Sequence, residues 1–142
     1  RERVKHILGP VGDRVWVSTF HSACVRILRK NATKLGYGEN FVIYDDRESL
    51  SLIKKVMAAL NINEKLFAPK AIAGRIDQAK NHLTNSASYA AMAKDFFSER
   101  AAKVYVADEE EMRKNNAVDF GDLIMLSVRL FNENPDLLKS YQ

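Results

Sequence analysis

The spacing of apolar residues is helical along most of this chain. Phe20, Cys24 and Leu28 recur at intervals that place them on one face of a helix, predicted from Phe20 to about Lys34 and ended by Gly36. The same spacing predicts further helices after Asp45, from Pro69, from Asn85 to roughly Asn115, after Asp119 and from Asn134. This pattern predicts a mainly α fold, a bundle of about five helices.

One short segment near the N-terminus has the pattern of a β-strand. Val15, Trp16 and Val17 are consecutive apolar residues of β-branched or aromatic type, followed by Ser18. Such a run is typical of a strand buried in a parallel sheet, yet no second convincing strand of this kind follows. We therefore expect an unpaired strand edge at 15–18, through which copies of the chain could associate. The remaining local predictions are a helix tail over 1–8 ended by Gly9–Pro10, a turn over 11–14, and a strand or extended piece over 41–44.

Capping residues mark several of the predicted helix starts. Asp45 with Glu48 three residues later has the form of a capping box, and Pro69 suits the first turn of a helix. Asp119 and Asp122 have the same spacing. We interpret this second pair as a cap and a first-turn acid rather than as two catalytic carboxylates.

Composition excludes several kinds of protein and site. Apolar residues make up 46% and charged residues 28% of the chain, as in ordinary globular proteins. No apolar run approaches the ~20 residues that span a bilayer, so no membrane partner is expected. Cys24 is the single cysteine, and the three histidines (His6, His21, His82) lack the spacing of metal ligands. Neither an internal disulfide nor a metal site is expected, and a reducing cytoplasm fits this composition.

Charge is distributed unevenly along the chain. The net charge is +4, but residues 1–40 carry eight Lys or Arg against three Asp or Glu, whereas residues 81–142 carry seven against ten. A basic N-terminal part and an acidic C-terminal part would orient the molecule toward a polyanion, although scattered, solvated charge explains the same numbers. The acidic run 108–111 is interpreted as a solvated face of its helix.

The tetrapeptide Thr19–Ser22 carries the clearest candidate chemistry. It lies where the predicted strand meets the predicted helix, so two hydroxyls and the His21 imidazole would lie beside unpaired backbone N–H groups and the positive end of the helix dipole. Such a combination of groups binds phosphate. The structural alternative is that Thr19 and Ser22 only cap the helix. Phe20 is expected in the core rather than stacked on a base.

Two further groups could contact phosphates. Arg26 lies on a basic side of the first helix with Arg29, Lys30 and Lys34, where a solvated face is an equally good interpretation. Lys80 and Asn81 end a predicted helix, where the dipole favours a cation, so a contact to DNA is the second interpretation there.

A series of segments in a fixed order gives these residues a context. The series consists of Val17–Ser22 with Arg26–Arg29, Phe41–Asp46, Pro69–Asn81, Asn116–Ile124 and Leu130–Gln142. It resembles the UvrD/PcrA/Rep helicases of superfamily 1 over nearly the whole chain. One departure is Gly121, because the family usually has Asp-Phe-Asp-Asp-Leu where this chain has Asp119-Phe120-Gly121-Asp122-Leu123. A role for a carboxylate at position 121 is therefore in doubt.

The resemblance implies a fragment of an ATP-dependent DNA helicase with 3′-to-5′ polarity. Residues 1–34 would be the tail of the first RecA-like motor domain, 35–118 the helical insertion called domain 1B, and 119–142 the return toward the motor. Contacts to DNA are expected from Thr19, His21, Ser22, Arg26, Lys80 and Asn81.

The resemblance also places the chemistry of ATP outside these residues. The phosphate-binding pattern G-x-x-x-x-G-K-[ST] is absent from the sequence, so ATP and Mg²⁺ are expected in the parent protein and no cofactor or catalytic residue in the fragment. The implied partners are single-stranded DNA, the duplex junction and the remaining domains of the parent, in the cytoplasm near the bacterial nucleoid. Two other functions stay open, a stand-alone nucleic-acid-binding helical module and a protein-interaction helical bundle.

Overall fold

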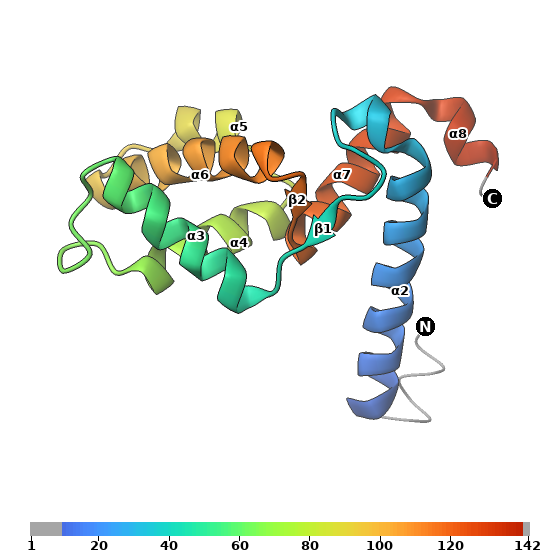
Figure 1. Ribbon diagram of the computed structural model, residues 1–142, viewed down its shortest axis with the longest axis horizontal. Coiled ribbons are helices and arrows are strands. Elements are labelled where there is room, and N and C mark those ends of the chain that lie inside the picture. The colour runs from blue at the N-terminus through green and yellow to red at the C-terminus, as the bar shows by residue number, and fades with distance from the viewer. Residues whose placement is uncertain (1–9, 141–142) are drawn as a thin grey trace.

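The described part of the chain is an assembly of helices with one short pair of strands (Figure 1). The computed structural model describes residues 10–140. Its first half consists of α2 (Pro10–Asn31), the 3₁₀ helix η1 (Ala32–Leu35), β1 (Val42–Ile43), α3 (Asp46–Ala59) and α4 (Pro69–Asn81). Its second half consists of α5 (Ser86–Met92), α6 (Phe96–Lys114), β2 (Ala117–Val118), α7 (Phe120–Glu133) and α8 (Pro135–Ser140). The prediction of a mainly α fold is confirmed.

Local capping chemistry sets the start of α3, the start of α4 and the end of η1 where the sequence predicts them. The Asp45 carboxylate accepts a hydrogen bond from the backbone N–H of Glu48 at 2.8 Å, and the Glu48 side chain accepts one from the Asp45 N–H at 3.1 Å. This completes the capping box of α3. Pro69 occupies the first turn of α4, and Gly36 ends η1 with a φ of 84°, a left-handed conformation that glycine adopts without strain.

The single long helix expected from Asn85 to Asn115 is wrong, because the structure has two helices there. Helix α5 ends at Met92, and α6 starts after Asp95, whose carboxylate accepts a hydrogen bond from the Ser98 backbone N–H at 2.7 Å. The two helices pack on each other, with the rings of Tyr89 and Tyr105 6.2 Å apart. The Asp95 cap and the packing of α5 on α6 favour two helices, although the hydrophobic pattern continues across the break between them.

The strand predicted at Val15–Ser18 is also wrong. Residues 10–31 form one continuous helix, which includes the turn expected at 11–14. A strand satisfies its backbone N–H and C=O groups only through a neighbouring strand, whereas a helix pairs its own. Because no described strand lies beside this segment, the helix is the conformation that satisfies its backbone. The expected self-association through a strand edge at 15–18 loses its basis. The helix tail predicted over 1–8 and its stop at Gly9 lie outside the described residues.

The strands that do form pair two distant parts of the chain. β1 and β2 are parallel, with Val42 opposite Ala117 and Ile43 opposite Val118. The extended piece predicted over 41–44 is thus confirmed at its centre. Backbone hydrogen bonds from Val42 to the Asn116 carbonyl (2.9 Å) and from Tyr44 to the Val118 carbonyl (2.8 Å) extend the ladder at both ends.

Buried apolar residues form two clusters, one on each side of this strand pair. The insertion cluster, as we call it, lies among α3, α4 and α6 and has Met57, Ile72 and Val104 at its centre. The terminal cluster combines α2 and η1 with α7, through Leu28, Leu123 and others. Figure 1 shows α3 to α6 on one side of β1 and β2, and α2, α7 and α8 on the other. Within the range 10–140, no helix is both long and apolar enough to cross a bilayer.

Candidate nucleic-acid interface

An exposed polar face runs along α2. Thr19, Ser22 and Arg26 are exposed, and their spacing of three and four residues places them on the same side of the helix, with Lys30 one turn further on. We call these four residues the polar face of α2. The structure thus gathers three of the DNA-binding residues predicted from the sequence, through helical periodicity alone.

The expectation that Thr19–Ser22 forms a phosphate-binding helix N-terminus is wrong. Helix α2 begins at Pro10, so Thr19–Ser22 lies within the helix rather than at its N-terminus. Backbone N–H groups within a helix are bonded to carbonyls one turn earlier, and the positive end of the dipole lies in the first turn. Thr19 and Ser22 therefore offer hydroxyls to a ligand but no free backbone donors.

His21 lies on a different side of α2, toward α7. Its ring is 5.2 Å from the ring of Phe120 between centroids, and it is half-buried. Phe20 is adjacent, with its centroid 6.4 Å from that of His21. Phe20 is 40% exposed, so the expectation that it belongs to the core is wrong. The helix therefore separates the imidazole from the hydroxyls that the sequence places beside it.

Arg29 has a structural position although it belongs to the predicted basic side. One guanidinium nitrogen donates hydrogen bonds to the carbonyls of Glu39 and Phe41, both at 2.9 Å. The same group lies over the Phe41 ring, 4.4 Å from its centroid. Arg29 thus holds the segment that leads into β1, which leaves Arg26 and Lys30 as the exposed cations over residues 19–31 of α2.

The two residues predicted at the end of α4 have different surroundings. Asn81 is exposed and lines the same cavity as Phe120. Lys80 is only 3% exposed, and its Nζ lies 2.8 Å from Asp119 Oδ2 and 3.0 Å from Asp122 Oδ1. Its ammonium therefore faces two carboxylates instead of solvent, which does not support the predicted contact of Lys80 with DNA.

The ion pairs of Lys80 are built on a helix cap. Asp119 accepts a hydrogen bond from the Asp122 backbone N–H at 2.9 Å, and Asp122 accepts one from the Asp119 N–H at 3.1 Å. The interpretation of these acids as a cap and a first-turn acid is confirmed. Burial by itself lowers the pKa of Lys80, but the carboxylates of Asp122 and Asp119 outweigh it and raise the pKa above its usual value. Lys80 therefore stays charged at neutral pH and ties α4 to α7.

Comparison with known sequences shows the family of this chain. A sequence model described as the UvrD/REP helicase N-terminal domain matches residues 1–142. This chain belongs to the UvrD/REP helicase family. It is 41% identical over 142 residues to the ATP-dependent DNA helicase PcrA of Bacillus subtilis, covering all of this chain and 19% of that protein. PcrA proteins of Staphylococcus epidermidis and Staphylococcus aureus are 40% identical over the same length, with 20% of each covered. The chain thus spans about a fifth of the length of these relatives.

The departure of this UvrD/REP chain from the family motif lies against Lys80. A Cβ atom on Gly121 would come within 3.0 Å of the Lys80 Cδ and 3.1 Å of its Cβ. The stem of Lys80 therefore occupies the space where a side chain at position 121 would start. With Asp119 and Asp122 both in place, Lys80 already has two carboxylate partners.

Sequence reasoning missed two residues that matter in this UvrD/REP chain. Phe120 lies beside His21, and its place in the Asp119–Leu123 motif was the available signal. Asp108 is 4% exposed, so the expectation that the whole acidic run 108–111 is solvated is wrong at its first residue. Nothing in four consecutive acids marks the first as buried, because the direction of each side chain depends on how α6 packs.

Proposed function

We propose that this chain is a DNA-contacting, non-catalytic part of an ATP-dependent DNA helicase that moves 3′-to-5′ on single-stranded DNA in the bacterial cytoplasm. The observation that carries the proposal is the family match over residues 1–142. Relatives that are 40–41% identical over the whole chain have the name ATP-dependent DNA helicase PcrA. Because the chain covers about a fifth of their length, the remaining domains of the parent are its first partners.

The division into two buried clusters supports a domain map for the parent. In the terminal cluster, residues from 24–43 pack with residues from 118–137. The insertion cluster is built from residues between them, from Leu52 to Ala117. We propose that 1–34 and 119–142 belong with the first RecA-like motor domain and that 35–118 contains the helical insertion, domain 1B. The clusters support this order but not the two boundaries, since residues from 35–43 and Val118 pack in the terminal cluster.

The polar face of α2 is the proposed contact to DNA. Hydroxyls and a guanidinium are groups that bind the phosphate backbone without reading bases. Thr19, Ser22 and Arg26 offer this chemistry on one exposed face. His21 and Asn81 lie at the Phe120 end of α7, where they would meet a strand or a duplex junction that continues past α2.

ATP and Mg²⁺ do not fit the described residues. Phosphoryl transfer from ATP requires a phosphate cradle, a carboxylate that holds the metal and a cation at the transferred group. The printed sequence lacks the G-x-x-x-x-G-K-[ST] pattern, and residues 10–140 contain no group of three or more His, Cys, Asp or Glu arranged to hold a metal ion. We therefore assign the nucleotide and its metal to other parts of the parent.

An arginine substitution in the full-length helicase tests the DNA contact. Arg26→Ala should weaken binding of labelled single-stranded DNA and reduce the slope of log K against log[salt] by about 1, because one phosphate contact is lost. Lys54→Ala is the matched control, since Lys54 is an exposed cation on α3 beside the insertion cluster. Equal effects of the two substitutions would reject the polar face of α2 as the contact. Tight binding by the 142-residue chain alone, with a steep salt slope, would favour a stand-alone module instead.

A further inference from the structure

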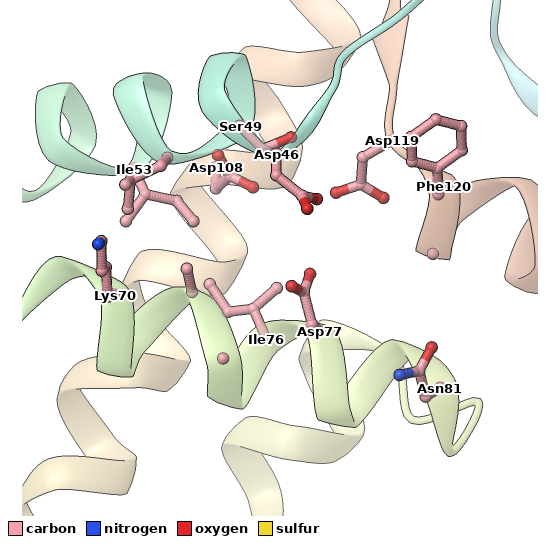
Figure 2. A pocket seen from close by; sticks show the side chains of 14 residues that line it. Asp46, Ser49, Ile53, Lys70, Ile76, Asp77, Asn81, Asp108, Asp119 and Phe120 are labelled. Atoms are coloured by element: carbon pink, nitrogen blue, oxygen red, sulfur yellow. The ribbon is translucent and has the colours of Figure 1, made fainter.

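A cavity of about 420 Å³ opens between α3 and α4, at the start of α7. Four aspartates line it, and they come from different elements: Asp46 from α3, Asp77 from α4, Asp108 from α6, and Asp119 from the cap of α7. Figure 2 shows their carboxylates turned toward the space between α3 and α4. We call this cavity the acidic pocket. Of the residues proposed to contact DNA, Asn81 lines this pocket, whereas Thr19, His21, Ser22 and Arg26 do not.

Two buried polar atoms that line the acidic pocket have no partner in the described structure. Asp108 Oδ1 and Ser49 Oγ are both buried without a hydrogen bond. Asp108 is 4% exposed, so its carboxylate is not compensated by bulk water. Leaving a buried acceptor of this kind unpaired is costly, and a charged one more so. A ligand that donates a hydrogen bond to Asp108 would remove this cost.

The charge balance of the pocket favours one sign of ligand. Lys80 is the buried cation nearby, but Asp119 and Asp122 already take its ammonium at 2.8 and 3.0 Å. Lys70 lies at the far end of the pocket from Asp77 and Asp119 (Figure 2). Asp46, Asp77 and Asp108 are therefore left without an ion pair among the described residues. A cation is the ligand that this field favours.

The lining of the acidic pocket favours an organic cation over a metal ion. A metal ion needs several oxygen ligands at 2.0–2.6 Å around one point. No group of three or more acidic, histidine or cysteine side chains within residues 10–140 meets that condition. Ile53 and Ile76 add apolar surface between the carboxylates. A planar guanidinium has donors that point in several directions and faces that pack on apolar side chains. We propose that the acidic pocket binds a guanidinium group, such as that of an arginine side chain.

The ionisation of Asp108 supports this proposal and predicts how binding depends on pH. Burial raises the pKa of Asp108 to about 7, and the raising effects of Asp119, Asp122 and Glu109 oppose the lowering effect of Lys80. Burial and the charge of Asp119 also raise the pKa of Asp77. A bound cation stabilises the ionised carboxylates, so binding releases protons and strengthens as the pH rises through 7.

Titration of the 142-residue protein with agmatine, an alkyl guanidinium, tests the proposal. We expect saturable binding by ¹H–¹⁵N NMR, with shifts that centre on the amides of Asp77 and Asp108, and tighter binding at pH 8 than at pH 6. Asp77→Asn and Asp108→Asn should each weaken it by about tenfold, the loss of one charge-assisted hydrogen bond. Glu64→Gln is the matched control, since it removes one exposed charge outside the pocket and should leave binding unchanged.

Three results would overturn the proposal. The first is the absence of saturable binding at millimolar agmatine, which would mean that the pocket holds water only. The second is equal binding by Asp77→Asn, Asp108→Asn and Glu64→Gln, which would place the agmatine elsewhere. The third is tighter binding of Mg²⁺ than of agmatine, with the same shifts, which would make the pocket a metal site. A thermal melt of each variant shows that it is folded before its binding is compared.

Discussion

At the scale of single residues, burial rather than residue type decides what the charged side chains do. Arg26 and Arg29 are three residues apart on one helix, yet Arg26 is exposed and Arg29 is bonded to two backbone carbonyls. Asp108 and Glu110 belong to one acidic run, yet Asp108 is buried and Glu110 exposed. The sequence shows which groups carry charge, but only packing shows which of them are available to a ligand.

Asp108 makes stability depend on pH in a direction that can be checked. Its pKa is raised by burial to about 7, so between about pH 4 and pH 7 the folded state binds more protons than the unfolded state, and stability falls as the pH rises. Asp108→Asn should therefore be about as stable as the original protein at pH 5, and about 1–3 kcal/mol more stable at pH 8. Urea unfolding at both pH values measures the difference. A loss of stability of similar size at both would contradict the burial of an uncompensated charge.

At the scale of elements, local chemistry was predictable and long-range pairing was not. The capping boxes of α3 and α7 each lie within four consecutive residues, so the sequence alone predicted the box of α3 and, for α7, a cap at Asp119 with a first-turn acid at Asp122. The strand expected at 15–18 failed because a strand depends on a partner, and the break between α5 and α6 was missed because the apolar pattern continues through it. The same limit applies to the candidate site. Thr19, Ser22 and Arg26 share a face by helical spacing, whereas the pairing of Lys80 with Asp119 joins residues far apart in the chain.

Asp119 both caps α7 and pairs with the buried Lys80. A matched pair of substitutions measures how much the ion pair adds to the free energy of unfolding. Asp119→Ala removes the cap and one partner of the buried Lys80, and should lower the free energy of unfolding by about 2–4 kcal/mol. Asp95→Ala removes a cap of the same kind from α6 with no buried cation attached, and should cost clearly less. Chemical denaturation of both variants gives the comparison. Equal losses would show that the ion pair to Lys80 adds nothing to stability.

At the scale of the whole molecule, the described residues form two buried clusters joined by α4, α7 and one short ladder of strands. The family to which the chain belongs was recognisable from its series of motifs, whereas the choice of residues for the proposed contact to DNA depended on exposure.

The 142-residue protein should not turn over ATP. We expect its rate of phosphate release, followed with a coupled assay in the presence of Mg²⁺ and single-stranded DNA, to equal that of a blank. The proposed full-length parent provides the positive control under the same conditions. Sustained turnover that scales with the concentration of the short protein would reject the assignment of nucleotide chemistry to the rest of the parent.

The parallel pairing of Val42 with Ala117 and of Ile43 with Val118 has a topological consequence. Neighbouring strands are about 4.8 Å apart, so the chain departs after Ile43 and re-enters at Ala117 within about 10 Å. Everything from 44 to 116 is therefore an excursion that starts and finishes at nearly one point. None of the residues that form the terminal cluster lies in that excursion. Residues 44–116 can thus be lengthened, exchanged or replaced by a short peptide bridge, in evolution or by design. The terminal cluster keeps all of its own residues in each case.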